Sequence, residues 1–476
     1  MANVRYVCLS DLHLGEEDSL LTAITPKGEV DLGSPSPVLL RLAECLAELL
    51  KHNQPSALKP VLILNGDLLE LALAHDHEAA QAFTFFLAAL MPANSELFGE
   101  IICIAGNHDH HLWETARETQ YVNYIRRHAH DATLEPPWHT TKVFIDTHGK
   151  DRLESGFLTA VAHRLPNLAR QNFEILMAYP NYGIAGDGRS VIFHHGHFIE
   201  PLYHLMSTID TLIASGQGLP ASLDELECEN FAWIDFFWSA MGRSGDTGKD
   251  LERIYKATGD RRSLQAISDT LAHNVAQEYD LPYLWPDFVE EFALKHLLRA
   301  FVVNRLSASQ ERQQVNEQAE GLPLSRSAFE GLRWYVESLL PNHVLEKEQR
   351  PIPQPATFVF GHTHKPFERA MDFKGYAGPV QVLNTGGWIV DSVRPEPSRG
   401  AAIVLLDDGL NAVNLRMYDE GLYETRVADA AGAGSNPLRE HIRRVLDHDP
   451  RPWCAFAGTA RAEVGKRPAL SKAAYQ

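Results

Sequence analysis

Residues 4–13 read Val-Arg-Tyr-Val-Cys-Leu-Ser-Asp-Leu-His, an apolar, strand-forming run that ends in a polar cluster. The same pattern recurs where residues 61–65 lead into Gly66-Asp67 and where residues 100–105 lead into Gly106-Asn107-His108-Asp109. Between the first two runs, residues 37–50 have apolar side chains at helical spacing, with Ser36 as N-cap and Pro37 in the first turn. This β-α-β order predicts an α/β fold, in which loops at the carboxyl ends of strands converge on a ligand crevice.

Two more polar clusters follow apolar runs later in the chain. Residues 174–178 and 190–195 read as two strands joined by a turn at residues 186–188, and the second leads into His194-His195-Gly196-His197. Strand signals return at residues 357–360, ahead of Gly361-His362-Thr363-His364, and continue at 379–384 and in a hairpin over 400–418. We therefore expect these clusters to join the first three.

The chain between these clusters loses its strand character. Helical spacing is found at residues 223–240, 262–279, 286–304 and 326–339, and residues 341–355 read as a proline-rich linker. The pattern predicts a discontinuous core over 1–197 and 357–430, with a large helical insertion and linker over 198–356. Residues 431–476 are expected to hold one helix, at about 437–447, and a poorly ordered tail.

Composition narrows the classes of function. The chain has 476 residues, with 43 Lys and Arg against 62 Asp and Glu, a net charge of −19 that disfavours nucleic acid as a partner. Its five cysteines are odd in number and scattered, which argues against a disulfide framework. Apolar runs fall short of the ~20 residues of a membrane span, and no signal peptide is visible, so a cytoplasmic location is predicted.

Taken together, the five clusters supply imidazole, carboxylate and amide donors that suit Mn, Fe or Zn. Their order resembles the calcineurin-like metallophosphoesterase superfamily, whose signature runs DxH, GDxx(D/E), GNH(D/E), a His before Gly, and GHxH. The matching blocks are Asp11-Leu12-His13, Gly66-Asp67-Leu68-Leu69-Glu70, Gly106-Asn107-His108-Asp109, His195-Gly196 and Gly361-His362-Thr363-His364. The resemblance covers about 1–110, 174–198 and 357–418. It implies a two-sheet β-sandwich (α+β) flanked by helices, with two metals at one rim.

The resemblance also implies how the metals are held. Asp11, His13 and His364 would bind one ion, Asn107, His195 and His362 the other, and Asp67 would bridge them. The expected cofactors are two divalent ions, Mn²⁺ first, with Fe, Zn or Co as alternatives. Such a pair, ~3.5 to 4 Å apart, is typical of a dinuclear phosphoesterase that hydrolyses a phosphomonoester, phosphodiester or pyrophosphate by attack of a metal-bridging hydroxide.

Two further residues receive catalytic assignments from the resemblance. His108 follows a ligand in the same loop and would protonate the leaving oxygen or stabilise the phosphoryl transition state, since an imidazole titrates near neutral pH. Glu70 stands three residues after the bridging Asp67 and would orient that histidine.

Neighbouring histidines leave alternatives open. His194 or His197 could replace His195 as the ligand, although His195 is the residue before the glycine and so the family match. His110 and His111 match no family ligand, and we expect them to be solvated or to face the substrate rather than to bind a third metal.

The substrate is less closely defined. Protein phosphatases of the superfamily carry Arg-Gly after GDxxD, where Leu71-Ala72 stand here. SDLHLG with GDLLE is similar to UDP-2,3-diacylglucosamine pyrophosphohydrolases, but those enzymes are far shorter and have Arg in place of His108. The expected partner is a phosphorylated small-molecule or lipid-linked substrate, selected by the insertion. A nuclease is disfavoured by the net charge, and a non-catalytic metal-binding scaffold is the alternative from another class.

Overall fold

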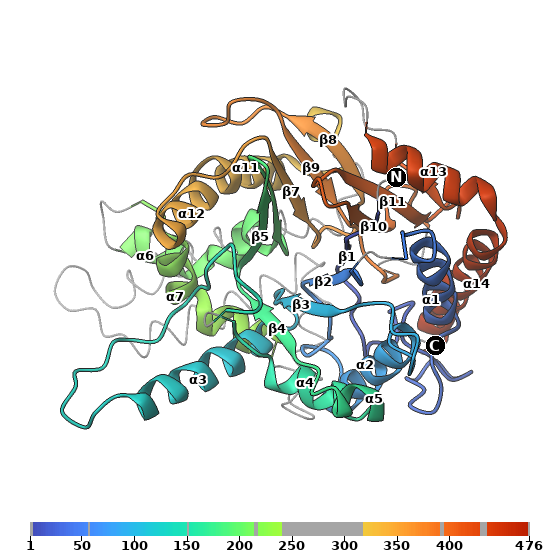
Figure 1. Cartoon of the computed structure of the whole chain (residues 1–476), viewed down its shortest axis with the longest axis horizontal. Coiled ribbons are helices and arrows are strands. Elements are labelled where there is room, and N and C mark those ends of the chain that lie inside the picture. The colour runs from blue at the N-terminus through green and yellow to red at the C-terminus, as the bar shows by residue number, and fades with distance from the viewer. Residues whose placement is uncertain are drawn as a thin grey trace, which may run out of the picture.

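The computed structural model describes residues 3–55, 58–149, 152–213, 218–239, 318–390, 395–428 and 436–474. Its centre is a pair of β-sheets with helices on their outer faces (Figure 1). The seven-stranded sheet runs in the order β12-β11-β10-β1-β2-β3-β4 and the five-stranded sheet in the order β5-β6-β7-β9-β8. The predicted fold class, a two-sheet α/β sandwich flanked by helices, is confirmed.

The seven-stranded sheet contains the three strands that the opening motifs predict. Its members are β1 (Tyr6–Leu9), β2 (Val61–Asn65), β3 (Glu100–Ile104), β4 (Ile175–Ala178), β10 (Gly400–Leu406), β11 (Ala412–Asp419) and β12 (Arg426–Val427). Strands β1 to β4 run parallel, and β10 pairs antiparallel with β1, so that Tyr6 lies opposite Leu406. The carboxyl ends of β1, β2 and β3 therefore meet at one edge, as expected.

The five-stranded sheet differs from the prediction in its first hairpin. Its members are β5 (Asn181–Gly186), β6 (Arg189–His194), β7 (Ala356–Phe360), β8 (Phe367–Met371) and β9 (Val380–Asn384). Residues 174–178 do not pair with β6, because β4 belongs to the other sheet; the antiparallel partner of β6 is β5. Gly183, Ala185 and Gly186 give β5 low strand propensity, which is why the sequence pattern misses it.

Apolar side chains fill the space between the sheets. Cys8, Ile63 and Ile102 point inward from the first sheet and meet Phe193 and Val359 from the second. Their neighbours Val7, Leu9 and Leu64 point to the opposite face, where they pack under helices. This alternation is the period of two expected of strands buried on both faces.

Helices cover both outer faces. On the side of the first sheet lie α1 (Pro37–Leu50), α2 (Asp76–Leu90), α4 (Gly156–Ala162), α5 (Pro166–Arg170), α13 (Pro437–His448) and α14 (Arg451–Ala474), while α3 (His110–Arg127) starts beside them and projects away (Figure 1). The Ser36 hydroxyl accepts a hydrogen bond from Val38 N, which confirms the predicted N-cap of α1. All five cysteines are unpaired, and Cys8, Cys45 and Cys103 are buried.

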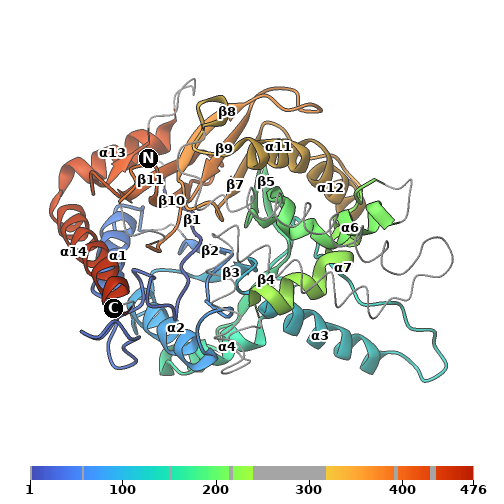
Figure 2. The same cartoon turned by 180° about the vertical axis from the view of Figure 1, so that it is seen from behind.

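The end of the chain is more ordered than predicted. A second helix, α14, stands where a tail is expected, and it packs along α1 (Figures 1 and 2). The buried Arg467 guanidinium donates hydrogen bonds to the carbonyl oxygens of Glu17 (3.0 Å), Ser19 (2.7 Å) and Thr22 (3.0 Å). The loop that follows the first motif is thus supported by a residue from the far end of the sequence.

The described parts of the predicted insertion are helical and pack on the second sheet. They comprise the 3₁₀ segments η1 (His197–Ile199), η2 (Pro201–His204) and η5 (Ala319–Gly321), the α-helices α6 (Leu205–Ile213), α7 (Leu223–Ile234), α11 (Arg326–Trp334) and α12 (Leu340–Glu348), and the π-helical η3 (Asp235–Ser239) and η6 (Tyr335–Leu339). Buried Leu226, Leu332 and Val344 meet Phe358 and Val382 of the sheet. The helices predicted at 262–279 and 286–304 lie outside the described residues, and the division of the chain at 197 and 356 remains our proposal.

Within the described residues, no helix combines the length and the apolar character that a bilayer crossing requires. The cytoplasmic location stays a prediction.

Candidate metal centre

The candidate residues gather at one edge of the sandwich, each in the loop that follows a strand. Asp11 and His13 follow β1, Asp67 follows β2, Asn107 and His108 follow β3, His195 follows β6, and His362 and His364 follow β7. Together with Glu70, none of these side chains is more than 1% exposed. Burying so many polar groups costs free energy unless they are paired or bind ions. The burial of this cluster therefore indicates a functional site.

Five of these residues have a left-handed backbone. The φ angles are 53° at Asp11, 45° at His13, 48° at Asp67, 67° at His362 and 56° at His364. Such angles are uncommon for residues with a Cβ and persist where the surrounding structure enforces them, typically at functional sites. The loops turn sharply enough to aim their side chains at a common point.

Motif glycines allow the loops to approach one another. A Cβ at Gly106 would lie 2.3 Å from Asp67 Oδ1, and one at Gly361 would lie 2.2 Å from Asp11 Oδ2. Both distances are far below van der Waals contact, which explains why the GN and GH pairs contain glycine.

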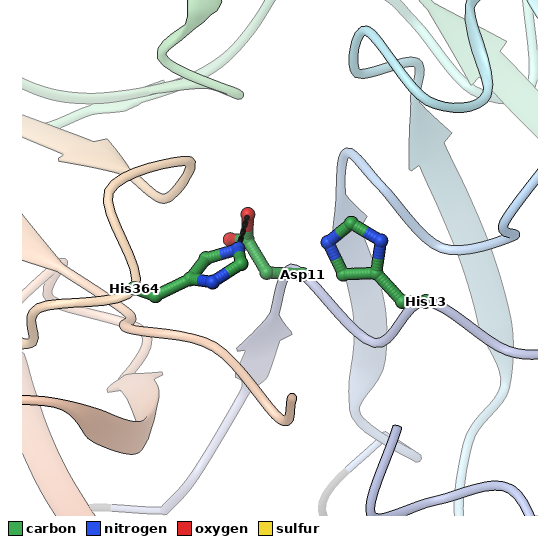
Figure 3. A group of neighbouring side chains, drawn as sticks. All are labelled: Asp11, His13 and His364. Atoms are coloured by element: carbon green, nitrogen blue, oxygen red, sulfur yellow. Dashed lines mark ion pairs between the residues drawn. The ribbon is translucent and has the colours of Figure 1, made fainter. Parts of the chain in front are cut away.

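The first group of donors is Asp11, His13 and His364 (Figure 3). His364 Nε2 lies 3.3 Å from Asp11 Oδ1, and the His13 ring lies on the other side of Asp11. The Asp11 carboxylate is fixed by the backbone N–H of His362, at 2.9 and 3.0 Å from its two oxygens, and by the Ser10 hydroxyl. The loops after β1 and β7 are therefore held in register by the carboxylate itself.

The second group centres on His195. Its Nε2 lies 3.2 Å from Asp67 Oδ2, 3.1 Å from Asn107 Oδ1 and 3.2 Å from His362 Nδ1. A single ring nitrogen carries at most one proton, so hydrogen bonding does not account for all three close neighbours.

Asp67 lies between the two groups. Its Oδ1 accepts a hydrogen bond from His108 N at 2.8 Å, whereas Oδ2 lies 3.2 Å from His195 Nε2 and 3.6 Å from His13 Nε2. One carboxylate oxygen thus faces both sets of donors.

These donors fit divalent cations. Bonds of about 2.1 Å to a common ion place neighbouring donors roughly 3.0 to 3.5 Å apart, which is the spacing around Asp67 and His195. In addition, the buried Nε2 of His13 has no hydrogen-bond partner among the described residues. His13 Nε2 lies 3.6 Å from Asp67 Oδ2, too far for a hydrogen bond. A cation between the two atoms would bind both.

Glu70 and His108 form a hydrogen-bonded pair beside these donors. Glu70 Oε1 lies 2.9 Å from His108 Nδ1 and accepts hydrogen bonds from Ala72 N and Leu73 N, both at 2.9 Å. Its Oε2 lies 2.8 Å from His13 Nδ1. Both oxygens have hydrogen-bond partners, and this arrangement fixes the orientation of the two histidine rings.

The alternative histidines point elsewhere. The His194 ring packs against Tyr335, with centroids 4.3 Å apart, and burial keeps its pKa well below the usual value. His197 lies against Tyr179, whose hydroxyl is 3.3 Å from His197 Nε2. Of the three neighbours, His195 is the one that the structure brings to Asp67.

His110 does not fit the expectation of a solvated residue. It is fully buried, with Nε2 2.7 Å from Glu227 Oε1 on α7 and Nδ1 3.5 Å from Asp235 Oδ1 on η3. Burial would lower the His110 pKa, but the two carboxylates outweigh it and raise the pKa to about 9. The expectation was wrong because the partners of His110 lie more than a hundred positions away in the sequence.

Some residues near the centre give no signal in the sequence. Glu200 lies in the loop after His195, only 4% exposed, with Oε1 2.9 Å from His362 Nε2. The rings of Tyr203 and Trp238 lie over the centre, with centroids 5.2 Å from His362 and 6.4 Å from His108 respectively. Asp109, the last residue of the GNHD block, joins two loops by accepting hydrogen bonds from Gly106 N (2.6 Å) and Leu68 N (2.7 Å).

The carboxylates give the centre a strong negative field. Burial alone would raise the pKa of Asp67, yet His195, His108 and His13 hold it well below the usual range. Burial would likewise lower the pKa of His195, but Asp67, Asp11 and Asp109 raise it to about 9. In the protein without ions, we therefore expect the His195 imidazole to carry a proton at neutral pH.

This proton predicts the pH dependence of metal binding. An imidazole must lose its proton to become a ligand, so binding at about pH 7.5 should release about one proton from His195, and apparent affinity should fall up to about tenfold per pH unit below 9. Calorimetry in buffers of different ionisation enthalpy measures the release. Metal binding with no buffer dependence would contradict the assignment of His195 as a ligand.

Comparison with protein families gives a match to part of the chain. Residues 4–212 match the model of the calcineurin-like phosphoesterase family, a segment that contains Asp11, His13, Asp67, Asn107, His108 and His195. Among curated proteins, none shows significant similarity to the chain. The matching segment supplies strands β1 to β6 of the two-sheet sandwich and most of the motif residues at its edge, which supports assignment to the calcineurin-like metallophosphoesterase superfamily.

Proposed function

We propose that the protein is a dinuclear metal-dependent phosphoesterase. The observation that carries the proposal is the position of Asp67, whose Oδ2 faces His13 on one side and His195 on the other. Asp11, His13 and His364 would hold one ion, and Asn107, His195 and His362 the other. Mn²⁺ is the expected metal, with Fe, Zn or Co as alternatives, because imidazole and carboxylate donors suit all four.

When bound, two ions supply Lewis acidity toward the phosphate and a water acidic enough to act as a nucleophile near neutral pH. The chain supplies the geometry. Asp67 would fix the separation of the two ions, while the backbone N–H groups of His108 and His362 hold the carboxylates of Asp67 and Asp11 in place.

His108 is positioned for proton transfer to the leaving group. Its Nδ1 is engaged by Glu70, so a proton carried on Nε2 is the one available to a departing oxygen. The Glu70 carboxylate would accept a hydrogen bond from Nδ1–H and so keep the ring oriented with Nε2 toward the leaving group. Because both side chains are buried, water competes little for that proton.

Tyr203 and Trp238 favour a substrate with an apolar or aromatic portion. Both rings are 3% exposed, lie 5.3 Å apart between centroids, and flank His362 and His108. A phosphorylated small molecule or lipid-linked phosphoester could place its organic group against them.

Hydrolysis of model phosphoesters tests the function. The chelator-treated protein, reloaded with Mn²⁺, is expected to hydrolyse bis-p-nitrophenyl phosphate or p-nitrophenyl phosphate, and the ratio of the two rates separates a diesterase from a monoesterase. A His130→Ala variant serves as control, because His130 is exposed and lies outside the centre. If ions bind with the expected stoichiometry but neither ester nor a pyrophosphate is cleaved, the protein is a metal-binding scaffold.

A further inference from the structure

A second cluster of ligand-type side chains lies outside the proposed catalytic centre. It consists of His111 and Glu114 on α3 and Asp235 on η3, whose donor atoms all lie within 4.8 Å of one another. His111 Nδ1 is 3.0 Å from Glu114 Oε2, 3.2 Å from Asp235 Oδ1 and 3.4 Å from Asp235 Oδ2. The cluster therefore joins the first turn of a core helix to the insertion.

The arrangement gathers three carboxylates, those of Glu114, Asp235 and Glu227, around two imidazoles. One ring nitrogen offers at most one proton, but it faces oxygens of two carboxylates that belong to different elements. The neighbouring His110 is engaged through Nε2 by Glu227 at 2.7 Å and approaches Asp235 at 3.5 Å, the limit of a hydrogen bond. The three carboxylates still outnumber the two imidazoles, and a divalent cation would neutralise the excess of negative charge.

The geometry matches that of a borderline divalent metal site. Distances of 3.0 to 3.4 Å between donors equal those between neighbouring ligands around an ion with bonds of about 2.0 to 2.1 Å. One nitrogen and two carboxylates are a donor set that Zn²⁺ and Co²⁺ accept, with water completing the coordination. Side-chain exposures of 19%, 28% and 15% for His111, Glu114 and Asp235 leave a route for the ion from solvent.

We propose that His111, Glu114 and Asp235 form a third divalent-cation site, distinct from the catalytic pair, which fastens η3 to α3. The same junction contains a hydrogen bond from His111 N to the Ser239 hydroxyl at 2.7 Å. It also carries Trp238, whose ring lies beside His108. Occupancy of the site would hold this part of the insertion over the catalytic centre.

Counting bound metal tests the proposal. The full chain is stripped with a chelator, equilibrated with Zn²⁺ by dialysis and analysed by mass spectrometry of the elements. Wild type is expected to bind one more Zn²⁺ per chain than Glu114→Gln, and Glu118→Gln, an exposed carboxylate one turn further along α3, should match wild type. Equal counts in wild type and Glu114→Gln would overturn the site.

Repeating the count in the Asp67→Asn variant distinguishes metal bound at this site from metal bound at the catalytic centre. In Asp67→Asn, which weakens the proposed catalytic pair, adding the substitution Glu114→Gln should still remove one Zn²⁺ per chain. Hydrogen exchange measures whether Zn²⁺ holds η3 against α3. In wild type and Glu118→Gln, Zn²⁺ should slow the exchange of the amides of residues 231–239. In Glu114→Gln it should not. If Zn²⁺ slows exchange equally in all three proteins, the proposal fails.

Discussion

Replacing Asp67 by asparagine is expected to lower the affinity for the second divalent ion by at least about 100-fold, because the carboxylate is the proposed bridge rather than a supporting partner. Asparagine has the same shape, tolerates the left-handed φ of 48°, and can still accept the hydrogen bond from His108 N. The fold should therefore survive. Titration with Mn²⁺ followed by electron paramagnetic resonance measures both affinities and the coupling between two ions.

Asp187→Asn is the matched control for this substitution. Asp187 also has a left-handed backbone, with φ of 49°, but it is exposed in the turn between β5 and β6. That variant should bind both ions as wild type does. Retention of two coupled ions in Asp67→Asn would remove Asp67 from its bridging role.

Replacing His108 by alanine is expected to cut turnover by about 10²- to 10⁴-fold, the usual contribution of a positioned proton donor. Metal content should stay near that of wild type, since His108 is not among the proposed ligands. Removing the ring leaves Glu70 with His13 Nδ1 and two backbone N–H donors, so its buried charge keeps partners. Steady-state rates on a phosphoester with an alkyl alcohol as leaving group, measured with the ion count on the same sample, test the effect.

The leaving group provides an internal check on that prediction. An ester whose leaving group is already a good one needs little protonation, so the loss in His108→Ala should be smaller for p-nitrophenol than for an alkyl alcohol. A loss equal for both leaving groups, or no loss at all, would argue against proton donation by His108.

The centre was predictable because its residues follow a rule of topology. Asp11, Asp67 and Asn107 each come directly after an apolar strand, and parallel neighbours bring the ends of such strands together. The sequence does not determine which ring nitrogen or carboxylate oxygen faces which neighbour. Those details depend on the left-handed turns at Asp11, His13 and Asp67.

Predictions failed where the deciding partner is remote. Residues 174–178 read as one arm of a hairpin, but the glycine-rich β5 takes that place beside β6. His110 is surrounded by Glu227 and Asp235 of the insertion, and no local pattern marks it as buried. Glu200 has no motif around it, so its contact with His362 becomes visible only in three dimensions.

The hydrogen bonds of Arg467 have a consequence for biosynthesis. The loop over residues 17–22 follows the proposed ligand His13. Three of its carbonyl oxygens accept hydrogen bonds from the Arg467 guanidinium near the other end of the sequence, and β1 pairs with β10 at residues 6 and 406. Such distant pairings form late, since the intervening chain must first be made and its ends brought together. During synthesis, the loop after the opening motif would gain its Arg467 contacts only once residue 467 has left the ribosome. Metal binding at the proposed centre would therefore follow synthesis of nearly the entire sequence.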